Sequence, residues 1–121
     1  MNVNRPLPVV FYRTEAGREP VREWLTRLAK TEKKVIGEDI KTVQFGWPLG
    51  MPLVEKLEAD LWEVRSKLEN KIARVIFTMA EDHMVLVHGF IKKGQKIPKQ
   101  DLDIARKRMK EVKRENNEQK K

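Results

Sequence analysis

Cysteine is absent from the chain, and histidine occurs only at His83 and His88. Without cysteine there is no disulfide, no thiol nucleophile and no cysteine-ligated zinc or iron–sulfur site. Two histidines are also too few for an all-histidine metal centre. We therefore expect a protein that works without a bound metal, and no sequence motif indicates any other cofactor.

Long apolar runs are missing as well. No segment approaches the ~18 consecutive apolar residues that a membrane-spanning helix needs. The apolar stretch near the N-terminus is interrupted by Pro6 and Pro8, which argues against a secretory signal. We expect a cytoplasmic protein with no membrane partner. Its 121 residues suit a single domain, covering residues 1–121.

Positive charge is abundant and unevenly placed. The chain has 26 Lys and Arg against 18 Asp and Glu, a formal net charge of +8. Residues 92–121 contain 12 of the basic and 5 of the acidic residues, so a local net charge of +7 lies on the C-terminal quarter. A small protein with this distribution usually meets a polyanion or an acidic partner.

The first half of the chain predicts a short strand and two helices. The β-prone run 9–12 favours a strand, and the pair Glu19-Pro20 is typical of a helix start. Glycine and proline punctuate residues 46–52, which predicts a loop. The buried faces of the helices are marked by apolar residues at helical spacing: Val21, Trp24, Leu25 and Leu28, then Val35, Ile36, Ile40 and Val43.

The second half predicts a meander followed by a helix. Three β-prone runs, 61–68, 72–80 and 84–91, are separated by short polar connections, which indicate antiparallel hairpins. After Pro98, apolar residues recur at helical spacing through Val112, and residues from about 114 to 121 form a polar tail expected to fray. The order β-α-α-β-β-β-α predicts an α+β fold with a small antiparallel sheet, helices packed on one face and a C-terminal basic helix.

The period of a strand sorts these side chains between two faces. The apolar sets assigned to the core are Trp62, Val64 and Leu68; Ala73, Val75, Phe77 and Met79; and Val85, Val87 and Ile91. Both faces of 84–91 are apolar, so the opposite assignment also fits this strand. The opposite face, which we expect to be open to solvent, then carries Arg65, Arg74, His88, Phe90 and Lys92.

This combination of side chains suits contact with RNA. Arginine makes planar, bidentate contacts with phosphate oxygens, and an aromatic side chain can stack on an unpaired base. Histidine side chains can transfer protons near neutral pH, so His88 is the candidate for proton transfer, and a lysine with a lowered pKa is the alternative. A solvated charged face and a structural histidine remain the simpler interpretation of the same residues.

Two longer segments carry a family resemblance. LWEVRSKLENKIARVIF and VLVHGFIKKGQKIPKQDLDIARKRM, together with the opening VVFYRTEAGREPVREWL, resemble the RelE/ParE superfamily of type II toxin–antitoxin toxins. Within it, the chain is similar to the HigB-like, phage-derived branch. The resemblance implies a ribosome-dependent mRNA endonuclease that needs no metal and inhibits translation.

By position, the resemblance implies a catalytic set of Arg65, Arg74, His88 and Lys92. The arginines would hold phosphate, and His88 or Lys92 would move protons. Further RNA or phosphate contacts are assigned to Lys67, Phe90, Lys93 and Lys96. Several ribosome-dependent relatives carry a late tyrosine or histidine that helps to activate the nucleophile, whereas here the only tyrosine is Tyr12 and no histidine follows His88.

The resemblance also implies partners. These are a cognate antitoxin, commonly a helix-turn-helix protein, the ribosome with its mRNA, and operator DNA reached only through the antitoxin. Two alternatives remain: a ParE-like toxin that inhibits gyrase without RNase activity, and a non-catalytic basic module that binds nucleic acid.

Overall fold

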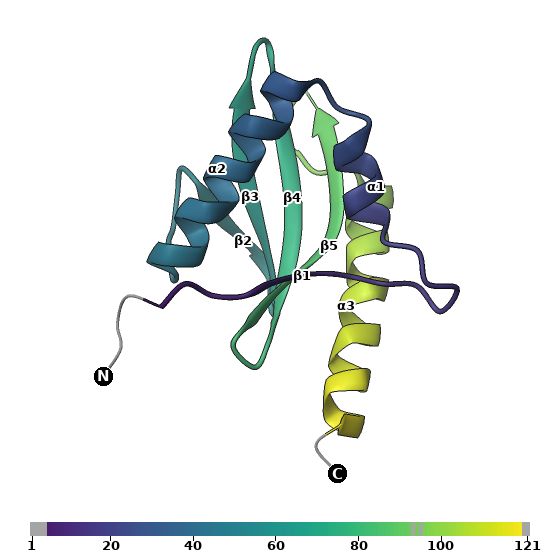
Figure 1. Ribbon diagram of the computed structural model, residues 1–121. Helices are drawn as coiled ribbons and strands as arrows, with labels where there is room; N and C mark the ends of the chain where they lie inside the picture. The colour runs from purple at the N-terminus through teal and green to yellow at the C-terminus, as the bar shows by residue number, and fades with distance from the viewer. Residues whose placement is uncertain (1–4, 93, 95, 120–121) are drawn as a thin grey trace.

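The structure is a computed structural model, and the residues it describes are 5–92, 94 and 96–119. The element order is β1 (Val9–Phe11), α1 (Pro20–Thr26), α2 (Lys30–Gly46), β2 (Val54–Glu58), β3 (Leu61–Leu68), β4 (Lys71–Ala80), β5 (His83–Lys92) and α3 (Lys99–Gln119). The predicted α+β class is confirmed (Figure 1), with one strand, β2, that the sequence patterns did not reveal. Helix α3 also continues to Gln119, through much of the segment expected to fray.

The five strands form one mixed sheet in the order β1-β5-β4-β3-β2. Strands β2 to β5 pair in antiparallel fashion, as the predicted meander requires, whereas β1 lies parallel to β5 at one edge. Asn70, between β3 and β4, has a φ of 62°. Asparagine tolerates this left-handed conformation better than most residues, which favours a tight hairpin there.

Helices α1 and α2 share one face of the sheet, as predicted, and the C-terminal helix α3 covers the other face, which the sequence did not predict. Helices α1 and α2 pack over a core that includes Ile36, Val64 and Phe77. Helix α3 lies on the other side, where Ala105 packs with Ile76. Figure 1 shows α2 crossing the front of the sheet, with α3 behind β5. An amphipathic α3 needs an apolar surface to bury its stripe, and the second face of the sheet supplies it.

The predicted alternation of β5 is wrong over part of its length. The pairing of β4 with β5 shifts between Ile76 and Phe77, as a β-bulge does. The extra residue reverses the parity of the strand, so Val85 and Val87 face α3 while Leu86 faces α1 and α2. His88 and Phe90, beyond the bulge, still lie on the side predicted for them.

Gly89 allows α1 to approach the sheet closely. A Cβ at this position would lie 2.5 Å from two ring atoms of Trp24, whereas a Cβ at Gly37, on α2, would meet nothing within 4 Å. We expect Gly89→Ala to lower the free energy of unfolding by about 1–3 kcal/mol through overpacking. Gly37→Ala should instead raise it by about 0.5–1 kcal/mol, because alanine favours the helix.

Urea unfolding of the two variants tests both predictions. Because glycine is replaced by alanine at both positions, Gly37→Ala is a matched control for Gly89→Ala. Equal stability of Gly89→Ala and the unsubstituted protein would mean that Trp24 does not press on β5 as described.

Of the helices described, none combines the length and the apolar composition that a bilayer span requires.

Candidate functional site

The predicted site residues form cross-strand rows on the face of the sheet that α3 partly covers. In one row Arg65 pairs with Arg74, which pairs with Phe90. Side chains directly opposite one another on neighbouring strands are about 4.5–5.5 Å apart at Cβ. The two flanking rows are Lys67, Ile72 and Lys92, and Glu63, Ile76 and His88. The predicted gathering of Arg65, Arg74, His88 and Lys92 on one face is therefore confirmed.

The expectation that this face is open is wrong for Arg74. Its side chain is fully buried (0% exposed), and its Nη1 donates to Glu63 Oε1 at 2.8 Å. Its Nη2 donates to the backbone carbonyl of Gly94 at 2.7 Å. Strand periodicity predicts the face of a residue but not which later segment folds over it. Here Gly94, which follows β5 in the chain, meets the row through its carbonyl.

The partner of Arg74 is equally buried. Glu63 is 0% exposed, and burial raises the pKa of its carboxyl while the guanidinium of Arg74 opposes that rise. Because the two charges offset each other inside the protein, Arg74 adds little to the positive field outside it. In the structure, its guanidinium holds the backbone carbonyl of Gly94 against the sheet.

Arg65 is in a different position, although it lies beside Arg74. Its side chain is half-buried, its Nε has no hydrogen-bond partner, and within the described residues it makes no ion pair. With Lys67, Leu53 and Ile72 it lines a cleft of about 390 Å³ that also touches α2. The cleft therefore carries two cations and one acid, Asp39 of α2, among apolar residues.

His88 is fixed between the sheet and α3. Its Nε2 lies 2.7 Å from Asp101 Oδ1, in the first turn of α3, and the two side chains are 14% and 18% exposed. Its ring stacks on Phe90 with centroids 5.6 Å apart and planes inclined by 28°. Phe90 thus packs on the imidazole and the α3 side of the core, and is not an open stacking platform.

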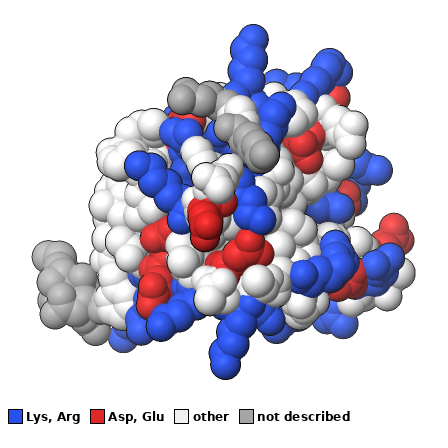
Figure 2. Space-filling model, turned by 90° about the horizontal axis from the view of Figure 1, so that it is seen from above, with Lys and Arg blue, Asp and Glu red and all other residues white. Residues whose placement is uncertain are grey.

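The remaining predicted cations lie where the sheet meets the segment before α3. Lys92 is half-buried at the end of β5, and Lys96 and Lys67 are exposed. Lys93 lies outside the described residues. Figure 2, which views the molecule from above Figure 1, shows Lys and Arg side chains with Asp and Glu between them. The positive field on this side is consequently divided into patches.

The only tyrosine belongs to another part of the fold. Tyr12 is buried, and its hydroxyl donates to Glu111 Oε1 at 2.7 Å. Burial and this carboxylate raise the pKa of Tyr12 to about 12. Since Glu111 lies well along α3 from Asp101, Tyr12 is not placed to act with His88, and the high pKa makes it a poor base near neutrality.

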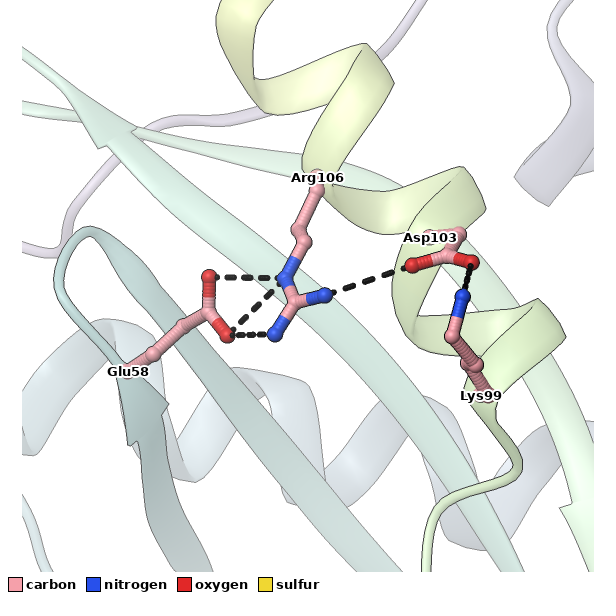
Figure 3. A network of polar contacts seen from close by, with 4 residues as sticks. All are labelled: Glu58, Lys99, Asp103 and Arg106. Carbon is pink, nitrogen blue, oxygen red and sulfur yellow. Dashed lines mark hydrogen bonds and ion pairs between the residues drawn. The ribbon is translucent and has the colours of Figure 1, made fainter.

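A second polar network fastens α3 to the sheet. Figure 3 shows Arg106 of α3 directed at Glu58 of β2, with Asp103 and Lys99 beside it. The guanidinium of Arg106 donates from Nε and Nη2 to Glu58 Oε1, at 3.0 and 2.7 Å. Elsewhere on the same helix, Arg108 Nη1 donates to the carbonyl of Val87 at 2.8 Å.

Sequence reasoning missed Glu63 and Asp101, the two acids that hold site residues. Glu63 carried a weak signal, since strand periodicity puts it on the same face as the apolar Leu61. No local pattern places Asp101 beside His88, because that contact depends on how α3 docks.

The family comparison agrees with this architecture. Residues 23–110 match the model of the family described as Phage derived protein Gp49-like (DUF891). The match spans most of the chain, and the protein belongs to this family, a HigB-like toxin family of the RelE/ParE superfamily. Membership of a toxin–antitoxin family implies a cognate antitoxin. No curated protein matches the sequence.

Proposed function

We propose that the protein is the toxin of a type II toxin–antitoxin system and cleaves ribosome-bound mRNA without a metal ion, which stops translation. The observation that supports this most directly is the placement of Arg65, Lys67 and His88 in adjacent cross-strand rows of one face. Two cations without an ion pair in the described chain, on the same sheet face as a fixed imidazole two strands away, are the set that we propose for phosphate binding with proton transfer.

The chemistry follows from the roles that these side chains can fill. A base takes the proton of a ribose 2′-hydroxyl, the 2′-oxygen bonds to the adjacent phosphorus, and the bond from phosphorus to the 5′-oxygen breaks. That leaving oxygen takes up a proton, giving a 2′,3′-cyclic phosphate and a 5′-hydroxyl. His88 is the proposed base, with Lys92 as the proton donor to the leaving group.

Arg65 and Lys67 stabilise the negative charge that develops on the phosphoryl oxygens. Preorganised cations of this kind usually contribute the largest single term to such a reaction. Lys96 and Lys93 extend the contact along the RNA backbone, and Phe90 keeps the imidazole in place. Arg74 acts from below, by holding the carbonyl of Gly94, which lies between Lys92 and Lys96 in the chain.

The proposed partners follow from the same surface. The ribosome and its mRNA supply the polyanion, and the antitoxin, proposed to be a helix-turn-helix protein, covers cationic residues until it is removed. The protein would reach operator DNA only through that antitoxin, and we propose no role for a membrane.

Induction of the unaltered protein in growing cells tests this function. Incorporation of labelled amino acids and of labelled thymidine is followed together with the 5′ ends of mRNA. We expect amino-acid incorporation to fall first, with new mRNA ends in phase with codons. Early loss of thymidine incorporation with translation intact would instead favour gyrase inhibition, and salt-sensitive RNA binding without any growth defect would favour the plain binding module.

A further inference from the structure

We propose that Asp101 is a positioning residue for proton transfer at His88, an inference that rests on the proposed function. Asp101 accepts a hydrogen bond from His88 Nε2 at 2.7 Å. This contact leaves Nδ1 as the nitrogen that carries the lone pair in the neutral ring. In the described chain Nδ1 makes no hydrogen bond, so it is the atom that can take a proton from a ribose hydroxyl.

A carboxylate in this position does two things for an imidazole. It selects the tautomer protonated at Nε2, and it stabilises the imidazolium that forms when the other nitrogen takes up a proton. The ring plane is held separately by the stacking of Phe90. The imidazole is therefore constrained both in orientation and in tautomer before any substrate binds.

Asp101 owes its position to a rigid support. It lies in the first turn of α3, next to Leu102, which packs against the sheet. Arg106, one turn further along, is held by two hydrogen bonds to Glu58 Oε1 (Figure 3). A carboxylate carried by a docked helix is placed more precisely than one on a loop.

The contact is not needed to attach α3. The helix is already held by Arg106 on Glu58, by Arg108 on the carbonyl of Val87, and by Lys113 on the carbonyl of Met79. Its apolar stripe adds Ala105 and its neighbours in the core. A partly buried ion pair contributes little net stability in general. Attachment of α3 to the sheet therefore does not by itself account for the contact between His88 and Asp101.

The charged groups around His88 leave Asp101 as the acid that can orient the imidazole. On α3 the nearby groups are Asp101 and Arg108, whose guanidinium bonds to the residue preceding His88. On β4 the residue opposite His88 is Ile76, and Arg74, one row away on the same face, is already neutralised by Glu63. Asp101 is thus the only acid that contacts this imidazole among the described residues.

The test compares Asp101→Asn with Asp103→Asn in cleavage of ribosome-bound mRNA. Asparagine keeps the size of the side chain but removes its charge and no longer selects one tautomer. We expect kcat of Asp101→Asn to fall about 10–100-fold with KM within about 2-fold, and Asp101→Glu to recover part of the loss. Asp103 lies on the same helix but pairs with Lys99 and Arg106, so its variant should keep the original kcat.

A second measurement does not depend on activity. Nitrogen-15 NMR of the imidazoles should show His88 as the Nε2–H tautomer in the unaltered protein and as a mixture in Asp101→Asn, while His83 stays unchanged. Cleavage by Asp101→Asn at the original rate, or an unchanged His88 tautomer, would overturn the inference. An unaltered protein that cuts no RNA would instead overturn the proposed function, so the two failures are distinguishable.

Discussion

Replacement of Arg74 by alanine is expected to lower the free energy of unfolding by about 3–5 kcal/mol. The substitution leaves Glu63 fully buried without its cation, and it removes the donor that satisfies the carbonyl of Gly94. An uncompensated buried charge costs far more than a lost surface contact. Urea unfolding followed by tryptophan fluorescence measures the change.

Two further proteins separate this explanation from simple loss of side-chain volume. The double variant Glu63→Leu/Arg74→Met removes both charges together, and we expect it to recover most of the lost stability. Arg18→Ala breaks an ion pair with Glu23 in which the arginine is 71% exposed, and it should leave the stability nearly unchanged. A double variant as unstable as Arg74→Ala would contradict the account.

This result bears on how Arg74 is tested for function. A loss of toxicity in Arg74→Ala cells would follow from unfolding alone and would say nothing about phosphate binding. The charge-free double variant is the informative protein. If it folds, its RNA cleavage reports whether the clamp on Gly94 is needed to position the basic segment before α3.

Replacement of Arg65 by alanine is expected to lower the rate of mRNA cleavage by about 10²–10³-fold while the fold survives. Arg65 makes no ion pair within the described chain, and its Nε already lacks a hydrogen-bond partner, so its removal strands no buried acid. Unfolding stability should stay within about 1 kcal/mol. Arg65→Lys should retain part of the activity, since it keeps the charge but not the bidentate geometry.

The matched control is Arg27→Ala. Arg27 is an exposed arginine at the end of α1, a helix whose core residues pack on the opposite face of the sheet from Arg65. It lowers the net charge by the same amount, so any general effect of charge on RNA binding appears in both proteins. Equal loss of cleavage in the two variants, or full cleavage by Arg65→Ala, would remove Arg65 from the proposed site.

Contrasting Arg65 with Arg74 shows how far strand periodicity can be taken. The alternation of apolar and polar residues in 61–68 and 72–80 correctly put both arginines on one face, because the period of a strand is a local property. It could not say that one is neutralised by Glu63 and the other faces a cleft. That difference depends on the backbone at Gly94, which comes from a segment far along the chain.

The bulge in β5 limited the prediction in another way. A single extra residue between the positions paired with Ile76 and Phe77 reversed the faces of Val85, Leu86 and Val87. Both faces of this strand are buried, so no polar residue marks the change in the sequence. Strand β2 was missed because Val54–Glu58 is short and lies close to the predicted loop.

The sequence by itself determined the class of the fold, the position of most helices and strands, the family, and the residues that share one face of the sheet. These depend on local periodicity and on motifs, which are readable along the chain. Only the tertiary structure decided that α3 covers the second face, that Glu63 buries the charge of Arg74, and that Asp101 meets His88. Each of these contacts joins segments distant in sequence, and their geometry follows from how the whole core packs.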